Sequence, residues 1–337
     1  MPILQSPRRH GGRWYPRSIV DAQTRPRDTR HNAWMQTLAA GVSFVDLEFQ
    51  QVPHVIATVV LRGPSGAALI DPGPASTLPV LRRKLAAAGL SMADVREVLL
   101  THIHLDHAGA TGTLVKERPD LRVFVHREGA PHLIDPSKLL ASAARLYGDA
   151  MDRLWGDVLP VPSDALVLLD GGERIDVASR ALDIAYTPGH ARHHVSYFSR
   201  DTGIAFVGDT AGIRLAPLDY ILPPTPPPDI DLALWDQSLA LLERWRPDTL
   251  FLTHFGPSGT VGAHLAELRE HLDVMAKMVR TSLARDDSDE GREGWFREEY
   301  KQQMARRLGP ADADAYETAG RLDLSWRGLA RYWRKKV

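Results

Sequence analysis

Apolar residues fall into two kinds of pattern along this chain, short runs typical of strands and longer stripes typical of helices. Stripes of apolar residues, some ending at a glycine, predict helices at 78–89, 109–117, most of 130–163, 232–244 and 265–283. Runs that predict strands lie at 42–49, 55–61, 67–70, 98–100, 121–125, 166–169, 182–186, 195–198, 204–207 and 249–252. Two strand-rich halves therefore flank the helical stretch.

The first residues differ in character from the rest of the chain. Residues 1–30 hold seven arginines against Asp21 and Asp28, and prolines interrupt any amphipathic helix there. We interpret residues 1–40 as a basic arm that is solvated or wraps another subunit, with organelle targeting as the alternative.

The remaining chain divides at a charged run. One catalytic domain is expected at 41–283, with a helical insertion at 130–163 and a Pro-rich pocket loop at 213–230. The charged residues at 286–291 interrupt the last apolar stripe, so residues 284–337 are expected to form a C-terminal helical extension. Together, the arm and this extension suggest a homodimer.

Composition restricts the chemistry more than the fold. The chain has 337 residues, a formal net charge of -1 and no cysteine, which excludes disulfides, a thiol nucleophile and thiolate metal sites. Any bound metal must therefore be held by His, Asp or Glu. No apolar run approaches the ~18 residues of a membrane span. We expect a cytoplasmic protein that acts on a small molecule, without a nucleic-acid or membrane partner.

A histidine-rich loop follows one apolar run. The segment 101–109 contains His102, His104, Asp106 and His107 directly after the predicted strand at 98–100. A strand that ends in such a loop can present metal ligands to a cleft from a rigid sheet. The alternative, an exposed polar loop, does not explain the residues found downstream.

Other apolar runs end in a side chain that can bind metal. Glycine or proline stands within two residues of each of these side chains and favours a tight turn at the end of the strand. The residues are Asp71, His190, Asp209 and His254. Each alone could be a turn or capping residue, but together they suit two metal ions, since nitrogen and carboxylate ligands bind zinc and also manganese, iron or cobalt.

The motif His102-x-His104-x-Asp106-His107, with isolated His, Asp and His at later strand ends, resembles the metallo-β-lactamase superfamily over about residues 42–260. The resemblance implies an α/β (α+β) fold, a four-layer αββα sandwich with its site at one edge of the two sheets. It further implies that His102, His104 and His190 bind one metal, that Asp106, His107 and His254 bind a second, and that Asp209 bridges them. Asp71 would orient the loop and would not bind metal.

Details of the motif separate branches of that superfamily. His104 departs from the diiron flavoproteins, and the lack of cysteine removes the zinc-thiolate site of many true β-lactamases. The ligand set is similar to that of glyoxalase II, acyl-homoserine lactonases and RNase Z. Segments 220–228 and 328–333 resemble a less characterised group of archaeal and bacterial hydrolases.

The resemblance implies a hydrolase with two divalent ions, zinc in the first place and manganese or iron as alternatives. A metal-bridging hydroxide would attack an ester, thioester or lactone, with Asp209 and Asp106 as catalytic residues. Phosphodiester or phosphotriester hydrolysis is the main alternative reaction, and β-lactam cleavage comes third. A non-catalytic scaffold would require a degenerate site, whereas this ligand set is complete.

The substrate pocket is less clearly marked than the metal ligands. The helical insertion and the Pro-rich loop are expected to enclose an apolar pocket, with Tyr147, Trp155, Arg214 and Tyr220 at its border or, alternatively, in simple packing. His193 and His194 are interpreted as part of the turn and strand start after His190. No motif surrounds the remaining histidines, which we assign to surface or core: His54, His126, His132, His264 and His271.

Overall fold

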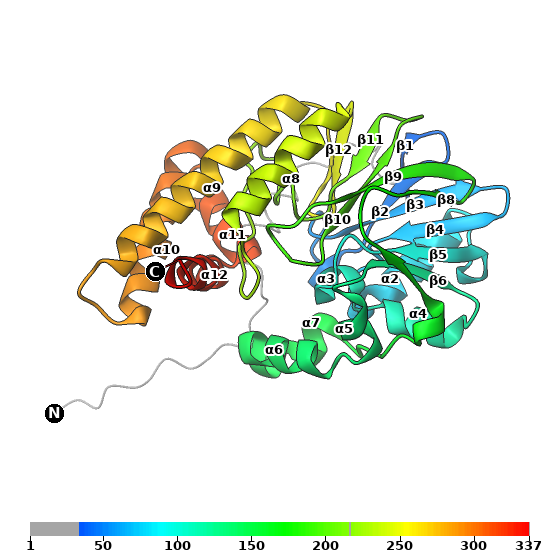
Figure 1. Ribbon diagram of the computed structural model, residues 1–337, viewed down its shortest axis with the longest axis horizontal. Coiled ribbons are helices and arrows are strands. Elements are labelled where there is room, and N and C mark those ends of the chain that lie inside the picture. The colour runs from blue at the N-terminus through cyan, green and yellow to red at the C-terminus, as the bar shows by residue number, and fades with distance from the viewer. Residues whose placement is uncertain (1–33, 216, 337) are drawn as a thin grey trace.

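The computed structural model describes residues 34–215 and 217–336, so the part of the expected basic arm before residue 34 lies outside the described residues. Its first sheet has seven strands in sequence order, antiparallel from β1 to β4 and parallel from β4 to β7 (Figure 1). The strands are β1 (Gln36–Ala39), β2 (Val42–Asp46), β3 (Ala57–Gly63), β4 (Gly66–Ile70), β5 (Val95–Leu99), β6 (Arg122–His126) and β7 (Leu166–Leu169).

The second sheet has six strands in the order β13-β12-β11-β10-β9-β8, and β11 and β12 form its parallel pair. Its other pairs are antiparallel. The strands are β8 (Arg174–Val177), β9 (Arg180–Tyr186), β10 (Val195–Ser199), β11 (Ile204–Phe206), β12 (Thr249–Leu252) and β13 (Gly256–Ser258).

One apolar core lies between the two sheets. Phe44 of β2 packs edge-on against Phe251 of β12 with ring centroids 5.2 Å apart, and Tyr197 and Phe206 are buried in the same cluster. A second apolar cluster joins the outer faces of the sheets to helices. The helices near the first sheet are α2 (Leu78–Ala87), α3 (Leu105–Ala108) and α4 (Thr111–Glu117), and those near the second are α8 (Leu232–Trp245) and α9 (Val261–Leu283) (Figure 1). This arrangement confirms the expected αββα sandwich.

Three further helices follow α9 and pack beside it (Figure 1). They are α10 (Asp289–Leu308), α11 (Pro310–Gly320) and α12 (Leu322–Arg334). The charged run that separates α9 from α10 is shorter than expected, since α10 begins at Asp289, where the Ser288 hydroxyl accepts a hydrogen bond from the Gly291 amide at 3.1 Å. No helix within 34–215 or 217–336 is both long and apolar enough to cross a membrane.

The region 130–163 is only partly helical. It contains α5 (Ala130–Ile134), α6 (Ser137–Tyr147) and α7 (Met151–Trp155), and Gly148 and Gly156 stand at the ends of α6 and α7 with positive φ. The short 3₁₀ helices of the structure are η1 (Phe49–Gln51), η2 (Ala75–Thr77), η3 (Met92–Asp94), η4 (Gly148–Ala150) and η5 (Ser163–Ala165).

The first predicted strand, 42–49, ends earlier than its alternation suggests. The Asp46 carboxylate accepts hydrogen bonds from the amides of Glu48 and His54, each at 2.9 Å, and so closes a turn. Glu48, Gln50 and His54 adopt positive φ in this turn. The turn brings Phe49 next to α7, where its ring stacks on Trp155 with centroids 5.7 Å apart.

Candidate metal centre

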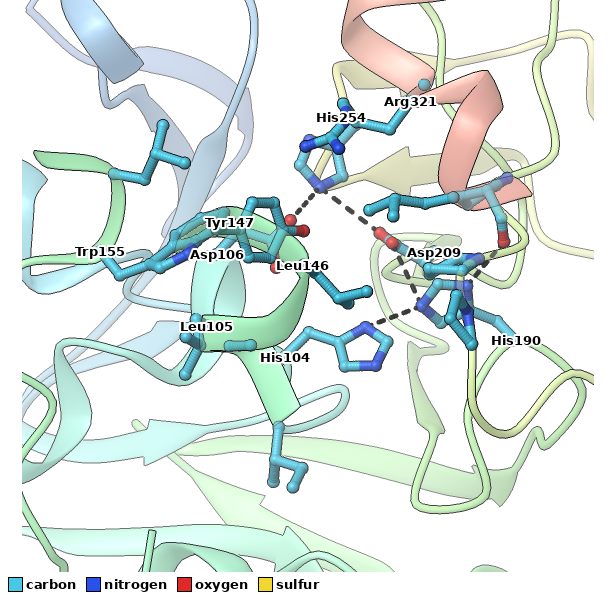
Figure 2. A pocket seen from close by; sticks show the side chains of 18 of the residues that line it. His104, Leu105, Asp106, Leu146, Tyr147, Trp155, His190, Asp209, His254 and Arg321 are labelled. Atoms are coloured by element: carbon cyan, nitrogen blue, oxygen red, sulfur yellow. Dashed lines mark hydrogen bonds and ion pairs between the residues drawn. The ribbon is translucent and has the colours of Figure 1, made fainter. Parts of the chain in front are cut away.

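Strand ends from both sheets bring the predicted ligands together. His102 and His104 lie in the loop after β5, whereas Asp106 and His107 lie in the first turn of α3. The remaining ligands come from loops that follow strands of the second sheet, at His190, Asp209 and His254. We call the group of His102, His104, Asp106, His107, His190, Asp209 and His254 the histidine cluster. Figure 2 shows its labelled members pointing toward one another.

Three histidines of this cluster form one group. The Nδ1 of His104 lies 2.9 Å from the Nε2 of His102 and 3.0 Å from the Nε2 of His190. Because each imidazole turns one nitrogen toward the same point, a single cation could contact all three.

A second group contains a carboxylate and two histidines. The Nε2 of His254 lies 3.3 Å from both the Oδ2 of Asp106 and the Nε2 of His107. The Asp106 Oδ2 and the His107 Nε2 are 3.8 Å apart. These donor atoms form a separate candidate site.

Asp209 lies between the two groups. Its Oδ1 is 3.2 Å from the His107 Nε2 and 3.6 Å from the His254 Nε2, whereas its Oδ2 is 3.4 Å from the His190 Nε2. The Asp209 Oδ1 is buried and has no hydrogen-bond partner among the described residues. A buried carboxylate oxygen without a hydrogen bond is unfavourable, and a cation held between the two groups would compensate it.

Hydrogen bonds to the ring nitrogens that face away from the centre, which we call the outer nitrogens, fix the orientation of two histidines of the cluster. The Nδ1 of His190 donates to the Pro224 carbonyl at 2.9 Å, and the Nδ1 of His254 donates to the Val55 carbonyl at 2.7 Å. Since a carbonyl only accepts, each outer nitrogen carries a proton and each Nε2 faces the centre. Such backbone contacts are typical of histidines that bind metal.

Asp71 holds the histidine loop in place. It adopts a left-handed conformation with φ 51°, which aspartate tolerates better than most residues. Its carboxylate accepts hydrogen bonds from the Thr101 amide at 2.8 Å, the Thr101 hydroxyl at 2.7 Å and the Thr253 hydroxyl at 2.9 Å. It also lies 2.8 Å from the His107 Nδ1. Asp71 therefore contacts the predicted ligand His107 on the side of its ring that faces away from the centre of the cluster. This is the position that the resemblance implies.

The charges of the cluster match a cation site. Burial lowers the pKa of His102 well below its ordinary value and lowers the pKa of His104 to about 3. Burial alone would also lower the pKa of His107, but the surrounding carboxylates outweigh it and raise that pKa well above its ordinary value. Burial opposes ionisation of Asp106 as well, yet His107 and His254 lower its pKa to about 2. Neutral His102 and His104 beside ionised carboxylates form a ligand set that attracts divalent ions, which would compete with the proton that the carboxylates hold on His107.

His194 helps to hold Asp209 in its position between the two groups, and the sequence did not indicate this contact. Its Nε2 accepts a hydrogen bond from the Asp209 amide at 3.3 Å, and its Nδ1 contacts the hydroxyls of Thr187 at 2.9 Å and Thr210 at 3.1 Å. Gly208 has φ 46°, and a Cβ there would lie 2.5 Å from the Thr101 Oγ1 and 2.7 Å from the His194 Nε2. Only glycine therefore fits between the two loops.

A cavity of about 350 Å³ opens onto the histidine cluster. Tyr147 and Trp155 lie on its wall, as expected, and His193 lies there too, so it is more than a turn residue. The His193 Nδ1 accepts from the Ile103 amide at 3.4 Å. His132, Leu139 and Leu146 of the insertion expected to enclose the pocket also line the cavity, whereas sequence analysis did not place Phe49, Arg321 and Leu324 there.

The structure does not place Arg214 and Tyr220 on this wall, in contrast to the sequence-based expectation. Ile213 and Leu215 take the lining positions, whereas the Arg214 guanidinium turns away and donates to the Pro257 carbonyl. Tyr220 is 3% exposed, and its hydroxyl lies 3.1 Å from that of Tyr300. Its ring stacks on His271, so Tyr220 joins the Pro-rich loop to the C-terminal helices.

Comparison with known proteins gives matches at both the sequence and the structural level. The model of the metallo-beta-lactamase superfamily matches residues 52–254. The metallo-beta-lactamase fold-containing protein ST1585 of Sulfurisphaera tokodaii is 28% identical over 229 residues, which cover 67% of this chain and 80% of the relative. The hydroxyacylglutathione hydrolase of Thermosynechococcus vestitus is 32% identical over 144 residues, only 43% of either chain. This chain therefore matches less than half the length of that enzyme.

Solved structures resemble the whole of the described fold. A metallo-beta-lactamase family protein from Thermus thermophilus, TTHA1429, superposes with a TM-score of 0.66 at 22% identity and covers 89% of this chain and 95% of its own. ST1585 superposes with a TM-score of 0.59 at 22% identity, covering 86% of this chain and 98% of its own. At these identities the similarity concerns the fold alone.

Proposed function

Because the chain belongs to the metallo-β-lactamase superfamily, we propose that it is a hydrolase that uses two divalent metal ions to cleave a carboxylic ester, thioester or lactone. The observation that carries this proposal is the position of Asp209. Its two carboxylate oxygens face different histidine groups, and the Oδ1 has no hydrogen-bond partner in the described chain.

The proposed ligands follow from the two groups of donor atoms. His102, His104 and His190 would hold one ion, and Asp106, His107 and His254 would hold the other, with Asp209 shared. Nitrogen and carboxylate donors suit zinc, and manganese or iron are the alternatives. Asp71 would keep His107 in the tautomer that a metal requires.

Ions held there would supply an activated water and polarise the substrate carbonyl. In the reaction, the water oxygen bonds to the carbonyl carbon, the bond from that carbon to the leaving oxygen or sulfur breaks, and the leaving atom takes a proton. Among the carboxylates, Asp106 is the more accessible, with 26% of its side chain exposed against 6% for Asp209. Asp106 faces the cavity (Figure 2) and would accept and pass on the proton at its carboxylate.

Two observations favour acyl chemistry over phosphoryl chemistry. The cavity beside the cluster is lined mainly by apolar side chains, among them Leu139, Leu146 and Trp155. In addition, the proteins similar in sequence include hydroxyacylglutathione hydrolases, which act on an acyl compound. Phosphodiester or phosphotriester cleavage is the competing reaction that the same ligand set would support.

The test is a substrate panel measured on metal-loaded and chelator-treated protein. We expect hydrolysis of acyl esters, thioesters or lactones that a chelator abolishes and zinc or manganese restores, with about two metal ions per chain by elemental analysis. Cleavage of phosphate esters alone, or full activity without metal, would overturn the proposal. β-Lactams belong in the same panel, with weaker turnover expected.

A further inference from the structure

Aromatic rings from two distant segments form one side of the cavity. Phe49 stacks on Trp155 with ring centroids 5.7 Å apart and an interplanar angle of 18°. Tyr147 meets Trp155 edge-on at 5.0 Å. All three rings line the cavity, as does Leu105, which follows the histidine loop, and Figure 2 shows Tyr147, Trp155 and Leu105 on the same side of it. This side therefore offers a large, rigid apolar surface beside the reacting centre.

The C-terminal helices supply another part of the cavity lining, next to these rings. Gly320 ends α11, and Leu324 in the first turn of α12 is 2% exposed although it borders the cavity. A Cβ on Gly320 would lie 2.0 Å from the Leu222 Cδ2, so glycine allows α11 to approach the Pro-rich loop closely. We call Phe49, Leu139, Tyr147, Trp155 and Leu324 the apolar wall.

Two charged residues that line the cavity, Arg321 and Asp229, are paired with other groups of the protein, whereas Lys138 lines it from an exposed position on α6. The Arg321 guanidinium donates to both oxygens of Asp323, at 2.9 and 2.7 Å, and lies over the Tyr147 ring, 5.4 Å from its centroid. The Asp229 carboxylate lies 3.3 Å from the Arg192 guanidinium. Both charges are thus compensated within the protein, which leaves the apolar wall suited to an uncharged group.

The size of the cavity sets the size of that group. A volume of about 350 Å³ has room for on the order of a dozen non-hydrogen atoms, if each takes about the 30 Å³ of a water molecule in the liquid. The ester group and its immediate neighbours at the histidine cluster use several of these. The remainder matches a chain or ring of roughly six to ten carbons.

We propose that this pocket selects substrates that carry an uncharged apolar substituent of roughly six to ten carbons on the ester, thioester or lactone, and that it discriminates against anionic peptide thioesters such as acylglutathiones. The proposal rests on the proposed hydrolase function and specifies its substrate class. It also assigns a part in specificity to Leu324, which lies far along the chain from the metal ligands.

The first experiment compares p-nitrophenyl esters of increasing acyl length with alkyl acetates of increasing alcohol length on the metal-loaded enzyme. We expect kcat/KM to rise by up to about fourfold per added methylene on one side of the ester until the pocket is filled. We also expect S-lactoylglutathione to react at least about tenfold more slowly than an octanoyl thioester. The inference would be overturned if kcat/KM stays constant or falls as the acyl chain and the alcohol chain are each lengthened. A preference for the glutathione thioester would also overturn it.

Two adjacent leucines of α6 provide a matched pair of variants. Leu139 borders the cavity, whereas Leu140 is similarly half-buried but is not among its lining residues. Leu139→Trp should lower the ratio of octanoyl to acetyl turnover about tenfold, and Leu140→Trp should leave that ratio unchanged. Equal ratios in both variants would contradict the assignment. Leu139→Ala adds no bulk and replaces the tryptophan variant in this test if that variant does not fold. It should lower the ratio of octanoyl to acetyl turnover about threefold.

A binding measurement separates this inference from the hydrolase proposal. 1-Octanol cannot be hydrolysed, so its binding to metal-loaded protein depends on the pocket alone. We expect a saturable change in tryptophan fluorescence that is lost in Trp155→Phe, because octanol would replace water beside this ring. Octanol binding without any esterase activity would overturn the proposed function while supporting the pocket. Esterase activity without octanol binding or length preference would overturn the pocket assignment and leave the hydrolase function intact.

Discussion

The histidine cluster and the apolar wall face the same cavity but are built in different ways. Each residue of the cluster is buried or partly buried at the end of a strand or just beyond it, and hydrogen bonds from behind hold several of them, such as the 2.9 Å contact of His190 with Pro224. Residues of the wall come from a turn, two short helices and the C-terminal helices, and they meet through ring and aliphatic packing.

In the proposed enzyme, the histidine cluster would carry out the reaction and the apolar wall would select the substrate. Strand ends are fixed by the hydrogen-bonded sheets, so they can hold ligands within a few tenths of an ångström. Helices that pack through apolar side chains tolerate changes of size and shape better. The cluster should therefore respond sharply to small chemical changes, and the wall should respond gradually.

The largest effect is expected from Asp209→Asn, which removes one charge from the centre of the cluster and keeps the side-chain shape. We expect kcat/KM to fall by about 10³ or more, since metal-centred charge stabilisation contributes several kcal/mol. Steady-state kinetics and elemental analysis check this. Asp183→Asn, at a β9 carboxylate that pairs with Arg174 of β8, is the matched control. A D209N enzyme that retains both ions and full activity would contradict the division between the two regions.

A pair of glycine variants compares the rigidity of the two regions. Gly208, behind the cluster, and Gly148, after α6, have similar φ values of 46° and 52°. A new Cβ would overlap Thr101 at the first position but would meet nothing within 4 Å at the second. We expect Gly208→Ala to lower the free energy of unfolding by about 3 kcal/mol, because backbone strain and steric overlap add. Gly148→Ala, at φ 52° and ψ -132°, should lower it by about 1–2 kcal/mol through backbone strain alone. Chemical denaturation measures both, and equal losses would show that the cluster is no more tightly packed than the wall.

Asp71→Asn should have a moderate effect on metal affinity. The amide nitrogen of Asn would face hydrogen-bond donors that now point at a carboxylate, and His107 would lose its charged partner. We expect metal affinity to fall by about 10- to 100-fold. Competition with a chromogenic chelator measures this loss, and wild-type affinity would mean that Asp71 only supports the turn after β4.

The smallest effect is expected from Tyr147→Phe. Burial raises the pKa of Tyr147 above its ordinary value, so its hydroxyl stays neutral and the ring mainly provides packing surface. We expect kcat/KM for an octanoyl ester to change by less than about threefold. A loss of 100-fold or more in the same assay would mean that the Tyr147 hydroxyl takes part in the reaction.

The sequence predicted most of the sandwich and brought together the right residues for the cluster, because both depend on local signals. Apolar runs mark buried strands, and glycine or proline within two residues of Asp71, His190, Asp209 and His254 marks the turns that follow. The strands β1, β8 and β13 were not predicted. Each has only three or four residues at or near a sheet edge, too few to show a period.

The apolar wall could not be predicted in the same way. Phe49 reaches the cavity because Asp46 closes a turn with its carboxylate, and Leu324 reaches it because α12 packs back along the chain. Neither event leaves a periodic pattern. The expectation for Arg214 and Tyr220 failed because the Pro-rich loop turns Ile213 and Leu215 inward in their place. Which side of an irregular loop faces a cavity depends on tertiary packing, which short-range sequence does not specify.

The position of Leu324 also has a consequence for biosynthesis. During translation, every residue of the histidine cluster leaves the ribosome before Leu324, which follows His254 by about seventy residues, or on the order of several seconds at ~5–20 residues per second. In the proposed enzyme, all the metal ligands would therefore be synthesised before the residue that completes the apolar wall.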